Sequence, residues 1–200
     1  MAVIVKRNIV PFTYRDYASW PADERWELID GVAWDMCAAP SYNHQAISAV
    51  LFGTFFTYFR GKQCKVLSAP LDVILPDKDE DDWQNSTTVV QPDILVICDK
   101  TKINRKGCVG APDLVVEIIS PYTSKKDIKE KYDLYERTDV KEYWIVFPGE
   151  QAIQVYAKNK DGLFDEGRVF DLSGERPEEA IVGSVLFPDL SVPLAEVFAD

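Results

Sequence analysis

The stretch that decides the fold is Pro112-Asp113-Leu114-Val115-Val116-Glu117-Ile118-Ile119, an apolar run that carries an acid near its end. A second run of the same kind, Val90-Gln91-Pro92-Asp93-Ile94-Leu95-Val96, precedes it in the chain. Both runs are typical of buried strands, where a carboxylate is costly unless a cation or hydrogen bonds compensate it. Asp93 and Glu117 therefore predict a site for a hard metal ion, with Mg²⁺ as the expected ion.

The composition indicates one globular domain. The chain has 200 residues, of which 46% are apolar and 12% aromatic, and this is enough for one domain with a substantial core. The longest apolar stretch, Ala46 to Phe59, contains Ser48, Gly53 and Thr54 and is shorter than the roughly 20 residues that span a bilayer. The first residues place their basic side chains after a short apolar run, which is the wrong order for a signal peptide. We therefore expect a cytoplasmic protein with no membrane partner.

The cysteines do not predict a zinc site. Cys37, Cys64, Cys98 and Cys108 form no Cys-x-x-Cys pair, and His44 is the only histidine, so a zinc cage has too few well-spaced ligands. In a cytoplasmic protein we expect these thiols to be reduced.

The net charge of −11 at first sight argues against a nucleic-acid partner. The charge is uneven, however, because residues 161–200 hold ten acids and two bases and residues 77–82 hold five acids and one base, which leaves +1 for the rest. Across residues 92–147 ten acids balance ten bases. A local face that binds phosphate groups is therefore compatible with the sequence. The bases of this region include Lys100, Lys102, Arg105, Lys106, Lys125, Lys126, Lys129 and Lys131.

Local patterns predict the order of the elements. A short helix after Thr13 and a hairpin that turns at Asp30-Gly31 come first. A long helix follows, capped by Ser41 or Asn43 and running to about Arg60. We then expect a strand at 64–75, the strands of Asp93 and Glu117, a helix at 125–138 and a buried strand at 143–147.

The core order is thus helix, three strands, helix and strand (αβββαβ). Three successive strands with short connections favour an antiparallel meander, and the second helix provides a crossover to a further strand. The fold class is α/β (α+β), with a mixed β-sheet flanked by helices. We expect a single domain over residues 1–200, made of an N-terminal helix and hairpin (12–40), the core (41–147), and C-terminal strands with an acidic tail (148–200).

The strand order also predicts which acids meet. If the two acidic strands are antiparallel neighbours, the beginning of the first lies beside the end of the second, so Asp93 lies near Glu117. Asp113 shares a face with Glu117, but four residues at about 3.3 Å each place it roughly 13 Å away, too far to bind the same ion. We interpret Asp113 as the structural start of its strand.

The following helix offers a cation to this pair. Asp127, Lys131 and Tyr135 recur every four residues and share one helical face. Lys131 could position or help to deprotonate a water, and could stabilise the charge on a phosphate under attack. The alternative is an exposed ion pair between Asp127 and Lys131, worth a few tenths of a kcal/mol.

These residues, taken with the order of the elements, resemble the PD-(D/E)XK nuclease superfamily. More closely, the chain resembles the Uma-two family, a bacterial group described as "putative restriction endonucleases". The resemblance runs from about Phe12 to Val192. It is carried by Trp26-Glu27-Leu28-Ile29-Asp30-Gly31, Pro40-Ser41-Tyr42-Asn43-His44, Gln91-Pro92-Asp93, the 112–121 segment, the Asp127, Lys131, Tyr135 series, and Glu142-Tyr143-Trp144-Ile145-Val146.

The resemblance implies a restriction-endonuclease-like core in which Asp93 and Glu117 bind Mg²⁺ or Mn²⁺. The superfamily pattern has a lysine two residues after the second acid, where this chain has Ile119. The family usually places this lysine on the following helix, and Lys131 occupies the matching position. The departure from the superfamily is therefore one that the family shares.

Two further residues match family positions. Glu27 matches an acid that could be a third ligand or orient a metal-bound water, and the alternative is a hairpin acid paired with Arg25 or another base. His44 could hydrogen-bond a carboxylate or a phosphate near the start of the long helix, and the alternative is a structural histidine.

The leading hypothesis is a metal-dependent endonuclease or phosphodiesterase that hydrolyses nucleic acid, with DNA as the expected substrate. Asp93, Glu117, Lys131 and Glu27 are the expected catalytic residues, and His44, Asp127 and Tyr135 are supporting. One alternative is an inactive nuclease-fold module that binds nucleic acid or protein. Another is a metal-dependent hydrolase of a small phosphoester. A homodimer is also compatible with an enzyme that cuts two strands.

Overall fold

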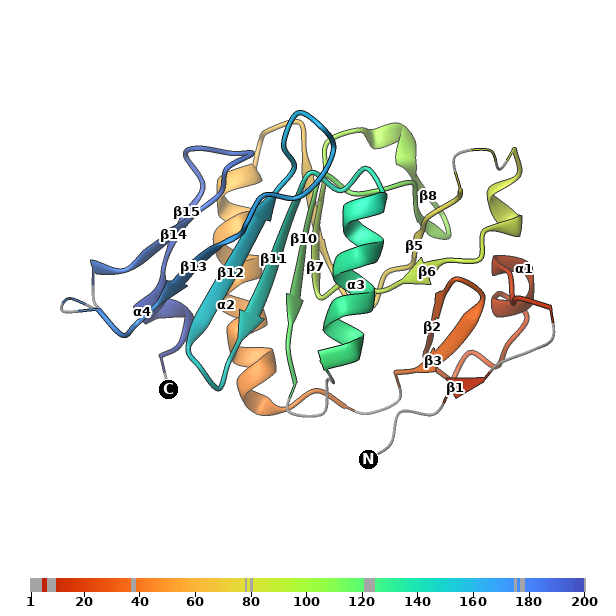
Figure 1. The fold of residues 1–200 in the computed structure, drawn as a ribbon, viewed down its shortest axis with the longest axis horizontal. Coiled ribbons are helices and arrows are strands. Elements are labelled where there is room, and N and C mark those ends of the chain that lie inside the picture. Colours follow the sequence, from red (N-terminus) through yellow and green to blue (C-terminus); the bar gives the residue numbers. More distant parts are fainter. Residues whose placement is uncertain are drawn as a thin grey trace. The chain divides into compact units, whose positions relative to one another are not determined.

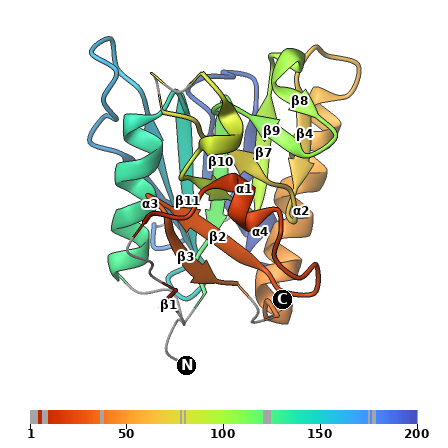
Figure 2. The ribbon, with the colours of Figure 1, turned by 90° about the vertical axis from the view of Figure 1, so that its right-hand side faces the viewer.

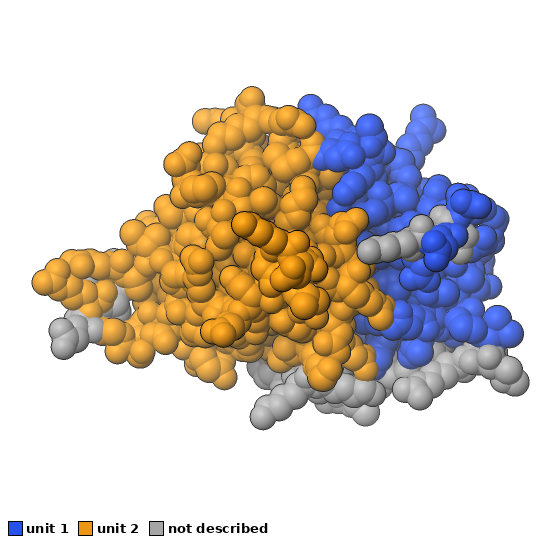
Figure 3. Space-filling model, turned by 45° about the horizontal axis from the view of Figure 1, so that its top comes forward, with its two compact units in different colours: residues 1–39, 70–91, 99–111 blue, residues 40–69, 92–98, 112–200 orange. Residues whose placement is uncertain are grey.

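The structure, a computed structural model, describes residues 5–6, 10–36, 39–77, 79, 81–120, 125–174, 176 and 179–199. The chain divides into two compact units, coloured separately in Figure 3. Unit 1 comprises residues 1–39, 70–91 and 99–111, and unit 2 comprises residues 40–69, 92–98 and 112–200. The chain thus passes repeatedly from one unit to the other. The single domain expected from the sequence stays a prediction.

Unit 2 is built on a six-stranded mixed sheet (Figure 1). β4 (Lys65–Ser68) pairs antiparallel with β7 (Ile94–Ile97), β7 antiparallel with β10 (Leu114–Ile118), and β10 parallel with β11 (Glu142–Phe147). The predicted mixed sheet is confirmed, and so is the core order, which within unit 2 reads α2 (Tyr42–Phe59), β4, β7, β10, α3 (Lys125–Arg137), β11. In spatial order the strands are β13 (Arg168–Asp171), β12 (Ala152–Ala157), β11 (Glu142–Phe147), β10 (Leu114–Ile118), β7 (Ile94–Ile97) and β4 (Lys65–Ser68).

The long helix α2 (Tyr42–Phe59) begins and ends as its sequence predicts. Ser41 is the N-cap, and its hydroxyl accepts a hydrogen bond from the backbone N–H of His44. Gly61 follows the last turn with a φ of +79°, a left-handed conformation that glycine adopts without steric cost. The Ser41 cap fixes the first turn of α2, and this turn carries His44.

Helices α2 and α3 (Lys125–Arg137) cover opposite faces of the six-stranded sheet (Figure 2). Val116 and Ile118 of β10 belong to the same buried cluster as Leu51 and Phe55 of α2. Because successive side chains of a strand point to opposite faces, Glu117 points to the α3 side. The alternation along β10 therefore decides which helix the predicted metal ligand meets.

The C-terminal segment of unit 2 extends the α2 side of the core. β14 (Ile181–Gly183) and β15 (Ser191–Pro193) form a two-stranded antiparallel sheet, followed by α4 (Leu194–Val197). Val182, Val192 and Leu194 are buried in the same cluster as α2. No helix among the described residues is both long and apolar enough to cross a membrane.

Unit 1 contains a seven-stranded sheet, the helix α1 (Tyr14–Tyr17) and the 3₁₀ turns η1 (Trp83–Asn85) and η2 (Lys100–Lys102). The predicted hairpin is confirmed, because Asp30 and Gly31 both have positive φ, as a two-residue type I′ turn requires. In spatial order the strands are β1 (Val5–Lys6), β3 (Val32–Asp35), β2 (Trp26–Ile29), β6 (Val89–Val90), β5 (Val73–Ile74), β9 (Gly107–Val109) and β8 (Ile103–Asn104).

The expected strand at 64–75 is wrong, because it is two strands in different sheets. β4 ends at Ser68 in unit 2 and β5 begins at Val73 in unit 1. Pro70 lies between them and has no N–H to donate to a continuous ladder. The expected short connections are also wrong, since β5 and β6 lie between β4 and β7 in the chain, and β8 and β9 lie between β7 and β10.

Candidate active site

The pairing of β7 with β10 decides where the two predicted acids lie. The antiparallel register ends at the pair Val116 and Ile94, so the next positions along the two strands are Glu117 and Asp93. Asp93 Oδ2 accepts a 2.7 Å hydrogen bond from the backbone N–H of Ile118, the residue after Glu117. The two acids therefore lie at the same end of adjacent strands within unit 2.

Two side chains of α3 hold the carboxylate of Glu117. Lys131 Nζ and Tyr135 Oη each donate a 2.8 Å hydrogen bond to Glu117 Oε1. The side chains of Lys131 and Glu117 are 16% and 9% exposed, and Tyr135 is fully buried. A pair this protected is screened by salt much less than a surface ion pair. The four-residue spacing of Lys131 and Tyr135 thus brings both onto one carboxylate oxygen.

His44 contacts Asp93 from the first turn of α2. Its Nε2 lies 3.3 Å from Asp93 Oδ2, and its side chain is 12% exposed. Burial lowers the pKa of His44, but the hydrogen bond to Asp93 and the charges of Asp93 and Glu117 outweigh burial, so the pKa lies above the ordinary 6.5. The carboxylate of Asp93 therefore favours the imidazolium form of His44.

The donor set fits a hard divalent cation with few protein ligands. Among the described residues no donor reaches Asp93 Oδ1, and no group of three or more His, Cys, Asp or Glu side chains surrounds one point. Mg²⁺ commonly binds one or two carboxylates and keeps several waters, whereas a structural zinc ion takes four protein ligands. The carboxylates of Asp93 and Glu117 therefore suit Mg²⁺ or Mn²⁺.

Asp113, another acid of the sequence prediction, lies outside this cluster. Asp113 Oδ2 accepts a 2.7 Å hydrogen bond from the backbone N–H of Cys98, and Oδ1 pairs with Lys141 Nζ at 2.6 Å. These contacts tie the start of β10 to its neighbours and agree with the structural role expected for Asp113. The side chain of Asp127 lies outside the described residues, so its supporting role stays a prediction.

Glu27 lies in unit 1, on β2, and its side chain is buried. Its Oε1 accepts a 2.7 Å hydrogen bond from the backbone N–H of Gln91, two residues before Asp93 in the chain. Arg25 Nη2 donates to Gln91 Oε1 at 3.0 Å. Glu27 therefore fixes the backbone at the start of the Gln91-Pro92-Asp93 segment, and its catalytic role stays a prediction.

A family model described as "Putative restriction endonuclease", the Uma2 model, matches residues 14–195. The chain belongs to the Uma2 family. This match covers both units, including every residue of the acid, lysine and histidine cluster.

Two known proteins resemble this Uma2 chain over most of its length. The "Uncharacterized protein slr1290" of Synechocystis sp. (strain ATCC 27184 / PCC 6803 / Kazusa) is 30% identical over 150 residues, which is 74% of each chain. The crystal structure of "a putative nuclease belonging to DUF820" from Anabaena variabilis ATCC 29413 covers 94% of this chain and 98% of its own, with a TM-score of 0.72 and 20% identity. This second likeness shows the shared fold.

One contact of the Uma2 site has no signal in the sequence. The N–H of Ile118 that bonds Asp93 is a backbone group, so no residue type could indicate it. It follows from the register of β7 against β10, in which β10 continues two residues, Glu117 and Ile118, past the last pair. The pairing register therefore supplies both the neighbouring acid and a donor that holds it.

The expectation of four reduced thiols is wrong for one pair, because Cys64 and Cys98 form a disulfide. They are 34 residues apart in sequence, and neither is part of a Cys-x-x-Cys pair. The antiparallel pair Lys65 and Ile97 joins β4 to β7, and the cysteines occupy the next positions outward. The β4–β7 register therefore creates this contact between cysteines that are distant in the chain.

Peptide mapping tests this disulfide. In protein purified and denatured without reductant, the peptides that contain Cys64 and Cys98 are expected to be linked and to resist alkylation until dithiothreitol is added. Cys108 is buried and lies outside this disulfide, and it provides the internal control, because it should be alkylated after denaturation in both samples. Full alkylation of Cys64 before reduction would contradict the pairing.

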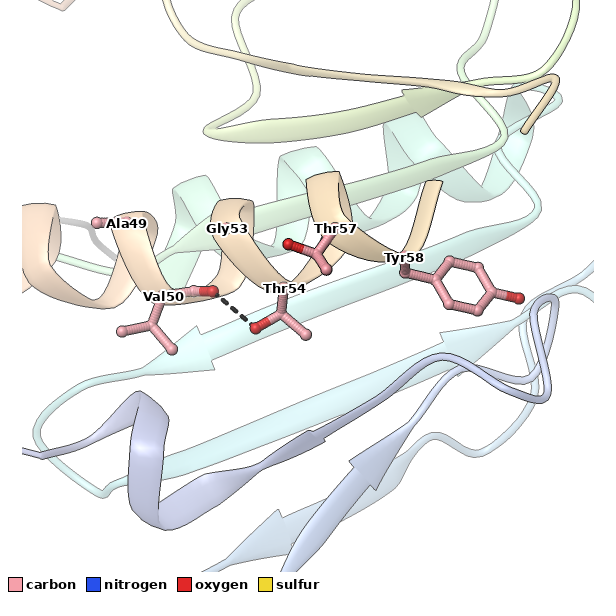
Figure 4. A pocket seen from close by; sticks show the side chains of 6 residues that line it. All are labelled: Ala49, Val50, Gly53, Thr54, Thr57 and Tyr58. Carbon is pink, nitrogen blue, oxygen red and sulfur yellow. Dashed lines mark hydrogen bonds between the residues drawn. The ribbon is translucent and has the colours of Figure 1, made fainter. Parts of the chain in front are cut away.

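A shallow groove on α2 does not belong to the acidic cluster (Figure 4). It is lined by Ala49, Val50, Gly53, Thr54, Thr57 and Tyr58. None of these side chains carries a charge, and the hydroxyl of Thr54 donates to the carbonyl of Val50 within the helix. The groove therefore offers no carboxylate for a metal ion and no base for hydrolysis.

Proposed function

We propose that this Uma2 chain is a metal-dependent endonuclease that hydrolyses phosphodiester bonds of DNA. The observation that carries the proposal is that β7, β10 and α3 bring two acids and a lysine together. Lys131 Nζ lies 2.8 Å from Glu117 Oε1, and the backbone N–H of Ile118 donates to Asp93. A pair of carboxylates with an adjacent lysine can bind a cation and act on a phosphate at one place. Membership of a family whose model is described as "Putative restriction endonuclease" supports the same chemistry.

Asp93 and Glu117 are the residues that would hold the metal. A divalent metal ion held by these carboxylates would supply polarisation of a phosphoryl oxygen and a lower pKa for an adjacent water. Both carboxylates are oriented before any cation arrives, Asp93 by the N–H of Ile118 and Glu117 by Lys131 and Tyr135. Tyr135 acts through Glu117 and is a positioning residue, as is His44 through Asp93.

Lys131 supplies positive charge beside the reacting phosphate. An ammonium group has three N–H donors, and one of those of Lys131 is engaged with Glu117 Oε1. When substrate is bound, the ammonium group can also turn an N–H toward the attacking water or toward a non-bridging phosphoryl oxygen. Negative charge grows on these oxygens while the water oxygen attacks phosphorus and the leaving oxygen departs. A fixed cation therefore stabilises the transition state, in which this charge is larger, more than it stabilises the ground state.

Cleavage and metal binding test the proposal together. Purified protein is expected to cut labelled single- or double-stranded DNA with Mg²⁺ or Mn²⁺ and to stop when EDTA is added. Asp93→Ala is expected to bind Mn²⁺ at least about 10-fold more weakly in calorimetry, since one of two carboxylate ligands is removed. Cleavage by the variant should fall in parallel.

Asp161→Ala is the matched control, because Asp161 is an exposed acid in a turn of unit 2 and the variant makes the same change in charge. It should bind metal and cut DNA as the parent does. A parent that binds Mn²⁺ through Asp93 but cuts no DNA would contradict the endonuclease proposal and favour an inactive binding module. Competition by mononucleotides stronger than by DNA would favour a small phosphoester substrate instead.

A further inference from the structure

The hairpin formed by β8 and β9 is a basic element in an acidic chain. Residues 99–110 contain one acid and four bases, a net charge of +3. The net charge of the whole chain is −11, so the other residues together carry −14. We infer that this hairpin, labelled in Figure 2, binds the phosphate backbone of DNA through Lys100, Arg105 and Lys106. The inference rests on the proposed nuclease function and names the surface of unit 1 that holds the substrate.

The base of the hairpin is rigidly anchored in the sheet of unit 1. Cys108 is fully buried, pairs with Val73 of β5, and donates a 2.8 Å backbone hydrogen bond to the carbonyl of Asp72. Gly107 packs so closely that a Cβ there would lie 2.1 Å from the Asp72 carbonyl oxygen. A groove-binding element needs such a support, because an ordered scaffold loses little entropy on binding.

The tip of the hairpin is exposed. Ile103 and Asn104 of β8 and the turn residues Arg105 and Lys106 all face solvent, and Lys100 is exposed in the preceding 3₁₀ turn η2. Asn104 Oδ1 accepts a 2.7 Å hydrogen bond from the backbone N–H of Lys106, which orders the turn. The hairpin therefore presents its cations on a short, ordered β-ribbon, a shape that the major groove of DNA accommodates.

Two other charged residues of this segment, Asp99 and Lys102, make hydrogen bonds within the protein. Asp99 accepts hydrogen bonds from the N–H and the hydroxyl of Thr101, and these bonds hold the pKa of Asp99 below its ordinary value. Lys102 Nζ donates a 2.8 Å hydrogen bond to the carbonyl of Ala111. Lys102 therefore ties down the base of the hairpin.

Lys100, Arg105 and Lys106 form no ion pair with any acid in the part of the chain that the structure describes. Exposed bases of an acidic protein readily find acids, so three that do not are available to an external anion. At about 0.1 M salt, charges more than roughly 10 Å away are largely screened. A local cluster of +3 can therefore attract DNA although the whole chain is negative.

The chemistry of the hairpin favours nucleic acid over a lipid surface. Membrane-binding elements combine bases with several large apolar side chains that enter the bilayer. Ile103 is the only large apolar side chain of residues 99–110 that is exposed, at 37%. Phosphates repeat along DNA at a spacing that a two-stranded ribbon with a basic turn can follow.

The test compares two triple variants with the same change in net charge. One is Lys100→Gln/Arg105→Gln/Lys106→Gln in the hairpin. The other is Lys65→Gln/Lys160→Gln/Arg168→Gln, which removes three exposed bases of unit 2. Binding of labelled duplex DNA in EDTA, which prevents metal-dependent cleavage, is measured over a series of salt concentrations. Hydrolysis of bis(p-nitrophenyl) phosphate with Mn²⁺ is measured in parallel, because this small ester needs no duplex-binding surface.

The hairpin variant is expected to bind DNA about 10-fold or more weakly at 0.1 M salt. The slope of log K against log salt should become shallower by about 2 to 3, at roughly 0.9 for each DNA phosphate that the protein no longer neutralises. The unit 2 variant should keep the slope of the parent, and both variants should hydrolyse the small ester at the parental rate.

Each other outcome overturns a separate claim. A parent that binds DNA with a slope unchanged in the hairpin variant would overturn the inference and leave the nuclease site standing. A parent with the expected DNA binding but no hydrolysis of either substrate would overturn the proposed activity alone. A parent that binds no DNA, or that uses the same three residues for phosphatidylserine vesicles instead, would overturn DNA as the partner of the hairpin.

Discussion

Lys131→Ala is expected to lower the rate of metal-dependent DNA cleavage by about 10²–10³-fold while leaving Mn²⁺ binding within a few-fold of the parent. The ammonium of Lys131 lies against Glu117 Oε1 with its side chain 16% exposed, so its charge acts in a protected site. Alanine removes the cation that stabilises charge on the phosphate but keeps both carboxylates. Single-turnover cleavage at saturating enzyme, beside calorimetric metal binding, separates these two effects.

Lys129→Ala is the matched control for this prediction. Lys129 lies on the same helix, two residues earlier, and forms an exposed i, i+4 ion pair with Asp133 at 2.7 Å. An exposed pair of this kind contributes little to stability, so the variant should cleave DNA at about the parental rate. If Lys131→Ala retained the full rate, the lysine would have no catalytic role. An equal loss in Lys129→Ala would point to damage of the helix instead.

The parts of the site that the sequence predicts are those set by local periodicity. Lys131 and Tyr135 share a helical face because a helix repeats every 3.6 residues. The side chain of Glu117 points to the face of the sheet opposite to that of Val116 and Ile118, because side chains along a strand alternate between the two faces. Only one further assumption, that the strands of Asp93 and Glu117 are antiparallel neighbours, brings these residues together, and the register confirms it.

The division into two units could not be predicted in the same way. The segments at 70–91 and 99–111 leave the main sheet and pair with β2 and with each other. Their strands have only two or three residues, too few to show a hydrophobic period. The disulfide of Cys64 and Cys98 and the N–H of Ile118 at Asp93 likewise depend on pairing between distant segments.

Glu142 belongs to the segments that carry the family resemblance, but the sequence alone indicates no role for it. It lies at the start of β11, fully buried. Its Oε1 accepts from Trp144 Nε1 at 2.6 Å, and its Oε2 accepts from the backbone N–H groups of Val185 and Leu186 at 2.9 and 2.6 Å and from the hydroxyl of Ser184 at 3.1 Å. One carboxyl group thus fixes the loop between β14 and β15 against the main sheet.

Glu142→Ala is therefore expected to lower the free energy of unfolding by about 4 kcal/mol, because several buried donors lose their acceptor at once. Denaturant unfolding at pH 5 measures this as a lower midpoint with an unchanged m-value. The control is Glu150→Ala, since Glu150 is an exposed acid in the turn after β11 and should change stability by less than about 0.5 kcal/mol. A Glu142→Ala loss as small as the control would show that the loop does not depend on this carboxylate.

The loss of unfolding free energy in Glu142→Ala should depend on pH. The burial of Glu142 decides whether this loss rises or falls with pH. Burial raises the pKa of Glu142 above 4.5, although the hydrogen bonds from Trp144, Leu186, Ser184 and Val185 lower it in part. Since the folded pKa exceeds the unfolded one, the stabilisation that Glu142 provides is complete below pH 4.5 and declines as the pH rises through the folded value. The difference in unfolding free energy between parent and Glu142→Ala should therefore be largest near pH 4.5 and smaller at pH 8. A difference that grew with pH would mean that the four donors outweigh burial and that the folded protein holds Glu142 as a carboxylate.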